Sequence, residues 1–334
     1  MKIGKLDNDL LEEIVLSHTG IRRPEVLVRP GVGEDCAVVG FGEQSCVLST
    51  DPITASAERI GALAVHVSCN DIAARGVEPL GIMLTVLLPP ETVTDDIRTI
   101  MSQAAGAAEE LNIEIIGGHT EITDTVKRPV ICATAIGNGG VHRRNEGPRP
   151  GDRILVTKQL AMEGTGIIAM EREDELKGFL SPDELSRAKS MLDGVSVVRE
   201  GVAAGRAGFT AMHDITEGGA LGAIWEMCSL WSVGAMIDEH LLPIDDVTRK
   251  ICGHYGLDPL RLISSGSMMI FAGPGQAAKI TEALSGGDNP VRVTEIGEVK
   301  EKTEGIIMSS RSAVGVPGRH IQIDPPGSDE IYRL

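Results

Sequence analysis

Residues 31–51, with the sequence GVGEDCAVVGFGEQSCVLSTD, constrain the fold of this chain more than any other stretch. Two short apolar runs, 36–40 and 46–49, are rich in β-branched residues and bounded by glycine, a pattern that predicts two neighbouring buried strands. Asp35 leads into the first strand, and Asp51 lies where the second is expected to end. We therefore expect the two carboxylates to converge at one edge of a sheet.

The polar residues at this edge suit a complex of magnesium and phosphate. Hard cations take carboxylate and hydroxyl oxygens as ligands, and Gly31 and Gly33 would let the backbone approach a phosphate. The same residues could instead form an acidic hairpin with solvated carboxylates, because short Gly/Asp signals often mark only a turn. The stretch alone leaves both interpretations open.

The rest of the chain alternates predicted strands with helices, which indicates an α/β (α+β) fold. At 334 residues the chain is long enough for about two domains with a core each. A stretch rich in Gly, Pro and Arg at 138–152 marks a boundary. We predict an N-terminal mixed-sheet domain over residues 1–148, a C-terminal α/β sandwich domain over 149–310, and an irregular tail over 311–334.

The individual elements follow from hydrophobic period and from helix start and stop signals. In the first half we expect a packing helix, a long buried helix and a helix capped by Thr94, at 8–18, 57–75 and 94–111. Further strands of this half are expected at 81–89, 113–116 and 129–137, the last closing the sheet. In the second half we expect strands at 153–157, 209–213, 233–238, 267–271 and 291–297, and helices at 164–173, 182–193, 197–206, 219–229, 244–254 and 275–285.

Charge and cysteine usage exclude several classes of function. The net charge of −17 argues against a nucleic-acid or anionic-membrane surface, and only 2% of residues are aromatic. A phosphate ligand would therefore need metal ions and backbone amides. The six cysteines lie far apart without a CxxC pair, which favours buried free thiols in a reducing compartment and no structural zinc. Without a signal peptide or a long apolar run, we expect a soluble cytoplasmic protein.

Three further stretches carry candidate site residues. Asn70 and Asp71 interrupt the long buried helix near its C-terminal end, where a carboxylate needs a partner such as a cation, unless Asp71 lies on a solvated face. The sequence Gly117-Gly118-His119 follows a predicted strand and could bind phosphate or metal, although a lone histidine there is more often structural. Arg143 and Arg144 could hold phosphate or simply solubilise the linker.

A fourth candidate stretch is the sequence 213–219, HDITEGG. Here a predicted strand delivers an acid-rich turn to the N-terminus of a helix, a geometry that binds anions or a metal beside them. An N-cap formed by Thr216 or Asp214 would explain part of the pattern without a function.

Together these motifs resemble the PurM-like superfamily in order and approximate spacing. The motifs are GVGEDCAVV, STDPIT, NDIAARGVEP, IIGGHTE, RPGD, HDITEGG and SSGSM, and the resemblance covers about residues 1–310. Within the superfamily, which includes AIR synthase, thiamine-monophosphate kinase and selenophosphate synthetase, the chain most resembles HypE-like hydrogenase expression/formation proteins. The resemblance implies a homodimer that pairs through its N-terminal domain, with an ATP site in a cleft.

The resemblance also implies roles for particular residues. Asp35, Thr50, Asp51, Asp71, Asp214 and Glu217 would hold Mg²⁺, with Ser49 as a further candidate, and three of them, Asp51, Asp71 and Asp214, would act in catalysis. Gly117, Gly118, His119, Thr216 and Arg144 would lie near the nucleotide, and Asn70 would support Asp71. Several carboxylates in one cleft are reasonable once divalent cations bridge them to a triphosphate.

The departures from the family pattern bear on the reaction. HypE proteins end in a cysteine that carries the carbamoyl group, whereas no cysteine follows Cys252 here, and the lysine of their glycine-aspartate-threonine-lysine motif is replaced by Glu121. Thiamine-monophosphate kinases carry an aspartate where this chain has His119. Selenophosphate synthetases need a reactive N-terminal cysteine, and the first here is Cys36.

The sequence thus predicts a PurM-like protein that binds magnesium ATP. The expected activity is ATP-dependent phosphorylation or dehydration of a small or protein-borne amide-like substrate, with an expected link to hydrogenase maturation and a maturation partner protein. The alternatives are a small-molecule kinase of the thiamine-monophosphate kinase type and a nucleotide-binding maturation partner without turnover.

Overall fold

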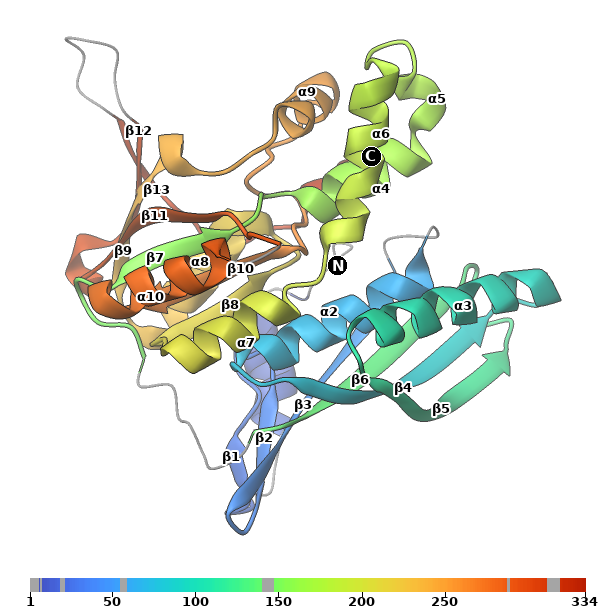
Figure 1. Ribbon diagram of the computed structural model, residues 1–334, viewed down its shortest axis with the longest axis horizontal. Coiled ribbons are helices and arrows are strands. Elements are labelled where there is room, and N and C mark those ends of the chain that lie inside the picture. Colours follow the sequence, from blue (N-terminus) through green and yellow to red (C-terminus); the bar gives the residue numbers. More distant parts are fainter. Residues whose placement is uncertain are drawn as a thin grey trace.

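Two mixed β-sheets and the helices packed on them form the chain in the computed structural model (Figure 1). The structure describes residues 6, 8–18, 22–54, 59–139, 147–286, 289–310 and 319–334. One sheet is built from the first half of the sequence and the other from the second half. The predicted α/β class with two sheets is confirmed.

The first sheet has six strands in the order β1-β2-β3-β6-β4-β5. Its strands are β1 Val26–Val28, β2 Ala37–Phe41, β3 Gln44–Ile53, β4 Pro79–Leu88, β5 Glu114–Ile122 and β6 Val130–Asn138. All neighbours are antiparallel except β4 and β5, which run parallel. The expected hairpin is present as β2 and β3. However, β6 lies in the middle of the sheet instead of closing it.

Two predicted strands end too early. β3 continues past Asp51 to Ile53, so Asp51 is a strand residue and not part of a turn. β5 contains Gly117, Gly118 and His119 within its span, because it stays paired with β4 as far as Ile122. Both strands run through the polar residues that the sequence analysis took as their ends.

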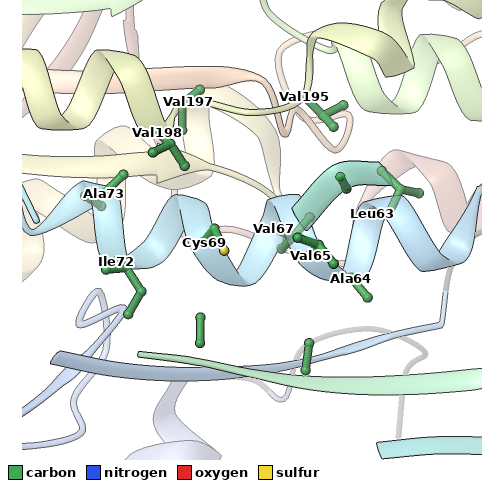
Figure 2. Close-up of a cluster of buried hydrophobic side chains, with 14 of the residues drawn as sticks. Leu63, Ala64, Val65, Val67, Cys69, Ile72, Ala73, Val195, Val197 and Val198 are labelled. Atoms are coloured by element: carbon green, nitrogen blue, oxygen red, sulfur yellow. The ribbon is translucent and has the colours of Figure 1, made fainter. Parts of the chain in front are cut away.

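The helix α2, Ile60–Ala74, lies between the two halves of the chain. Every residue of α2 except Ala62 is buried, as its small and apolar composition predicts, and Asp71 is only 7% exposed. The interpretation of Asp71 as a solvated residue is therefore wrong. Figure 2 shows α2 with strands of the first sheet on one side and Val195, Val197 and Val198 on the other. One continuous apolar core thus serves both halves.

Close approach of two helices fixes α2 against the second half. The helix α7, Val198–Ala207, packs on α2 (Figure 1), and a Cβ placed on Gly201 would lie 2.2 Å from the carbonyl oxygen of Ala73. Only glycine fits this position without moving backbone. The helix α3, Thr94–Glu110, covers the same face of the first sheet as α2.

The second sheet has seven strands in the order β13-β12-β9-β11-β7-β10-β8. They are β7 Arg153–Thr157, β8 Ala211–Ile215, β9 Gly234–Asp238, β10 Ser267–Ala272, β11 Val293–Lys300, β12 Ile306–Ser310 and β13 Arg319–Gln322. The other helices of this half are α4 Met162–Glu171, α5 Glu173–Leu176, α6 Pro182–Ser190, α8 Gly219–Trp231, α9 Asp246–Tyr255 and α10 Pro274–Ser285. β8, which carries Asp214, forms an edge of this sheet and packs against α2.

Some predicted local features differ from the structure. Residues 8–18 form a short α1, Asn8–Leu10, followed by a π-helical turn and a 3₁₀ turn, and none of these residues is buried. Thr94 does not cap α3, because the helix is preceded by Val93, whose N–H donates to Asp96 at 3.1 Å. The tail is partly regular, with β13 and a 3₁₀ turn at Glu330–Arg333.

All six cysteines are free thiols, of which Cys46 and Cys132 are half-buried and the other four are buried. Within the described part of the chain, every helix is too short or too polar to cross a bilayer.

Candidate functional site

A cavity of about 670 Å³ is lined by residues from both halves of the chain. The first half contributes the segment from Pro30 to Ala37, the strand residues Leu48 to Ile53, and Asp71 of α2. The second half contributes residues of α4, β8, α8 and the tail. Among the described lining residues none is a lysine or an arginine, so an anionic ligand here needs another source of positive charge.

Four aspartates from four separate segments meet at this cavity: Asp35, Asp51, Asp71 and Asp214. Alternation along β3 places Ser49 and Asp51 on the face that α2 covers, and the turn of α2 directs Asp71 toward them. The Ser49 hydroxyl donates to the Asp71 carboxylate and lies 3.5 Å from Asp51 Oδ2. The topology therefore assembles the cluster from residues far apart in the sequence.

Asp214 is the least satisfied member of this cluster. It is 1% exposed, and neither of its carboxylate oxygens has a hydrogen-bond partner. Burial raises the pKa of Asp214 to about 7, and the negative charge of Asp35 adds to the effect. Burial, with the charges of Asp214 and Asp51, likewise raises the pKa of Asp71 well above its ordinary range. A buried carboxylate without a donor is costly, which indicates that a cationic group belongs beside it.

His213 is a functional residue that the sequence analysis missed. Its Nδ1 lies 2.8 Å from the Asp35 carboxylate and its Nε2 lies 3.3 Å from Glu226 Oε2. Burial alone would lower the pKa of His213, but Asp35 and Glu226 together outweigh it and raise the pKa well above the ordinary value. The imidazolium therefore offsets part of the acidic charge at the cavity. Its position directly before Asp214 in a buried strand was the available sequence signal.

The cluster suits a magnesium ion. Asp35, His213 and Asp214 each offer a ligand atom, and these atoms lie within 4.8 Å of one another. Mg²⁺ prefers oxygen ligands and few protein carboxylates, while His213 is occupied by its two acidic partners. The unpartnered oxygens of Asp214, with Asp35, Asp51 and Asp71 close by, fit a hard divalent cation.

Two predicted residues, Thr50 and Asn70, do not join the aspartate cluster. Thr50 points to the opposite face of β3 from Asp51, and its hydroxyl lies 2.9 Å from that of Thr134. Asn70 is fully buried and bonds to the second half of the chain, since its Nδ2 donates to Val195 O at 2.9 Å and its Oδ1 accepts from Val197 N at 2.8 Å. Asn70 thus joins two segments instead of supporting Asp71.

The glycine pair also has a structural explanation. Gly117 and Gly118 have φ of +154° and +148°, and a Cβ on Gly118 would lie 2.0 Å from Leu84 O in the neighbouring strand. His119 is exposed, with Nε2 3.4 Å from Glu121 Oε2. None of these three residues lines the cavity within this chain. Arg143 and Arg144 lie outside the described residues.

Thr216 and Glu217 do line the cavity, at the start of α8. The residue before this helix is Gly218, with φ +90° and no side-chain cap of its own. Neither Thr216 nor Asp214 caps the helix, so the N-cap that the sequence analysis offered as a non-functional explanation of this motif is wrong. Instead, Asp329 of the tail accepts from Gly218 N at 2.7 Å.

Three other cavity or near-cavity residues had no sequence signal. Glu163 is 4% exposed in the first turn of α4 and accepts from Ser265 N at 3.3 Å. Tyr332 lines the cavity from the tail, and its hydroxyl lies 3.5 Å from Glu217 Oε2. Asp329 is completely buried just behind them. Tertiary folding alone brings these residues to the site.

Comparison with known proteins covers nearly the whole chain. Residues 33–138 match the family model described as AIR synthase related protein, N-terminal domain, and residues 149–309 match the corresponding C-terminal domain. A putative hydrogenase expression/formation protein of Methanocaldococcus jannaschii is 28% identical over 99% of this chain and 97% of its own length. The carbamoyl dehydratase HypE of Cupriavidus necator is 27% identical over 72% of this chain and 68% of its own length.

Solved structures show the same fold at lower identity. A HypE–HypF complex gives a TM-score of 0.75 at 22% identity, covering 94% of this chain and 99% of the other. A hydrogenase maturation protein HypE in complex with ATP gives 0.68 at 20% identity, with 99% and 97% covered. Thiamine monophosphate kinase from Aquifex aeolicus gives 0.66 at 19% identity, with 90% and 94% covered.

Proposed function

The chain belongs to the AIR synthase related family, and from that premise we propose that it is a magnesium-ATP-binding protein linked to hydrogenase maturation. The PurM-like fold and the resemblance to HypE-like proteins that the sequence predicts are both confirmed. The proposed reaction is ATP-dependent phosphorylation or dehydration of an amide-like substrate. The name of the relative from Cupriavidus necator, a carbamoyl dehydratase, supports this substrate class.

The pair of buried, unpartnered oxygens on Asp214 is the observation that carries the proposal. A structure selected only for stability would provide these oxygens with donors, as nearly all buried polar groups have them. The cavity beside Asp214 is lined by three more aspartates and by no described lysine or arginine. A divalent cation would provide a partner for the Asp214 oxygens and would also offset the acidic lining, so that an anionic ligand can bind.

The residues of this chain have definable roles in such a site. Asp35, Asp51, Asp71 and Asp214 would hold Mg²⁺, which would supply positive charge to the phosphates of ATP. Ser49 orients Asp71 through its hydrogen bond. His213 holds Asp35 in place through its hydrogen bond and supplies a positive charge next to the aspartate cluster. Because catalysis of phosphoryl transfer rests on positioning and charge stabilisation, these residues act mainly by geometry.

The protein is also proposed to be a cytoplasmic homodimer. On the face of β4 and β5 opposite α2 and α3, large apolar side chains are exposed, including Leu80 at 55% and Met83 at 46%. Apolar side chains gathered on one sheet face favour a protein interface. In a dimer that pairs through this face, Gly117, Gly118 and His119 would lie near the partner, which would account for their distance from the cavity of this chain. The HypE–HypF complex supports a further, maturation partner protein.

A second candidate is a small-molecule kinase. It is favoured by the likeness of the whole fold to thiamine monophosphate kinase, with a TM-score of 0.66. In that case ATP binding would be the same, but the acceptor would be a phosphorylated alcohol and not an amide.

Calorimetry of magnesium-dependent ATP binding tests the proposal. Binding that requires Mg²⁺ and is lost in Asp51→Asn is the expected result, with the exposed-site variant Asp174→Asn as a control that binds normally. No binding at millimolar ATP would remove the proposal. Substrate-dependent ADP release then separates an enzyme from a nucleotide-binding partner that does not turn over.

A further inference from the structure

We propose that the end of the cavity formed by Glu163, Glu217, Ser265 and Tyr332 is the acceptor subsite, and that it selects a group rich in N–H donors and excludes a phosphorylated one. This inference rests on the proposed function, because it takes the aspartate cluster as the end that receives the phosphates of ATP. It adds the part of the site that distinguishes among acceptors.

The composition of this end of the cavity points to a donor-rich ligand. Glu163 is nine-tenths buried or more, lines the cavity, and has hydrogen-bond partners only on Ser265 among the described residues. Burial is the largest cause of the raised pKa of Glu163, and the charges of Asp329 and Glu217 add to it. Among the residues that the structure describes, no basic side chain offsets these charges. A ligand N–H group would add a second donor to the Glu163 carboxylate, and a hydrogen bond to a charged acceptor is a strong one.

The same geometry disfavours a metal ion at this end. Among the described residues, ligand atoms converge closely enough to hold a metal only in the group of Asp35, His213 and Asp214. Glu163 and Glu217 belong to no such group. A phosphate is disfavoured more strongly, because it would place a dianion beside two carboxylates with no described lysine or arginine in the lining.

The tail holds this subsite in shape. Tyr332 lines the cavity, and its hydroxyl lies 3.5 Å from Glu217 Oε2. Asp329 ties the tail to the two segments that carry Glu217 and Ser265, since its carboxylate accepts from Gly218 N at 2.7 Å and from Ile263 N at 3.2 Å. These hydrogen bonds hold the tail and the segments that carry Glu217 and Ser265 in fixed positions around the subsite.

Three small probes test which charge the subsite prefers. Each carries one methyl group: methylguanidinium is a cation, N-methylurea is neutral and methyl phosphate is an anion. Saturation-transfer NMR would follow their binding to the full chain loaded with Mg²⁺ and the non-hydrolysable analogue AMPPCP. We expect saturable binding of the first two and none of methyl phosphate. Glu163→Gln should weaken methylguanidinium by about tenfold, the loss typical of one charge-assisted hydrogen bond. Glu171→Gln, at the exposed end of the same helix, should leave it unchanged.

The outcomes separate this proposal from its alternatives. Methyl phosphate that binds and is displaced by thiamine monophosphate would overturn it in favour of the kinase. Weaker AMPPCP binding in Glu163→Gln with unchanged methylguanidinium would also overturn it, because Glu163 would then contact the adenine amino group. If Glu163→Gln does not fold, Glu163→Asp retains the charge with a shorter reach and should weaken methylguanidinium to a smaller degree; unchanged binding overturns the proposal.

Failure of the proposed function gives a different result. In that case Mg²⁺ and AMPPCP do not bind at all. The probes can still be titrated into the nucleotide-free chain, where a preference for methylguanidinium that depends on Glu163 supports the subsite independently of ATP, and its absence overturns the subsite as well.

Discussion

Two buried aspartates near the same cavity differ in how their charge is satisfied. Asp329 in the tail is 0% exposed and accepts three backbone N–H groups, from Gly218 at 2.7 Å, Ile331 at 2.8 Å and Ile263 at 3.2 Å. Asp214 in β8 is 1% exposed and accepts none. The pKa of Asp329 rises to about 6 through burial, opposed by these hydrogen bonds, while that of Asp214 rises to about 7.

The difference separates a structural acid from a binding acid. The folded chain supplies everything that Asp329 needs, so this residue stabilises the tail without any ligand. Asp214 is held in a place where the chain supplies nothing, and its neighbours Asp35 and Asp71 make its charge more costly. The unpartnered carboxylate of Asp214 therefore lowers the stability of the ligand-free protein, which is common at ligand-binding sites.

Asp214→Asn should separate the two roles most sharply. We expect magnesium-ATP affinity to fall by about a thousandfold, which is about 4 kcal/mol, because a central ligand of the cation loses its charge. In the metal-free protein the same change should raise the free energy of unfolding by about 1 kcal/mol, since repulsion within the cluster is relieved. Calorimetry and urea unfolding measure the two effects. Lower metal-free stability in this variant would show that Asp214 is structural.

Stability of the metal-free protein should depend on pH in a direction set by Asp214. Its pKa is raised on folding, from 3.8 to about 7, so the folded state binds more protons than the unfolded state between these values. Stability is therefore full below about pH 4 and is lost as the pH rises toward 7, by about 4 kcal/mol from this group. Urea unfolding in EDTA across this range measures the slope. Asp214→Asn, or saturating Mg²⁺, should flatten it; an unchanged slope in both would contradict the assignment.

Asp329→Ala tests the other side of the comparison. It leaves three backbone donors without their acceptor, so we expect the free energy of unfolding to fall by about 2 kcal/mol. Asp329→Asn retains one side-chain oxygen acceptor and should lose about half as much. Denaturant unfolding compares the two variants. If Asp329→Ala is as stable as the wild type, the tail is not held by this carboxylate.

The smallest expected effect concerns Ser49. Its hydroxyl donates to Asp71, so Ser49→Ala should raise the pKa of Asp71 further and weaken magnesium-ATP binding by about fivefold, about 1 kcal/mol. Ser45→Ala, four residues earlier on the same face of β3, is a matched control that should bind as the wild type does. Calorimetry at fixed pH gives both values.

The sequence was informative wherever a residue's role follows from its strand or helix. Asp35, Asp51, Asp71 and Asp214 were predicted as one group, and the structure brings them to one cavity. Thr50 was grouped with them through the family resemblance. Because β3 continues past it, alternation places Thr50 and Asp51 on opposite faces of the strand.

Other residues could not be assigned without tertiary contacts. Gly118 looked like a phosphate-binding glycine, but the close approach of Leu84 explains it, and that approach exists only once β4 and β5 pair. Tyr332 and Asp329 lie in a stretch without hydrophobic period, so no local pattern links them to a cavity built from the other end of the chain. Asn70 was expected to support Asp71 because the two residues are adjacent in the sequence. Adjacent residues of a helix point in different directions, so their side chains do not face each other.

The helix α2 gives the molecule a mechanical property. Its buried side chains fill the core of both halves (Figure 2), Asn70 is bonded across to Val195 and Val197, and Gly201 packs directly on Ala73. Opening the halves as on a hinge would expose this helix along its length. The two halves are therefore expected to melt together in a single transition, and a polypeptide cut at the linker should yield no folded fragment from either side. Ligand binding is therefore expected to leave the two halves fixed relative to each other, because α2 is packed into the core of both.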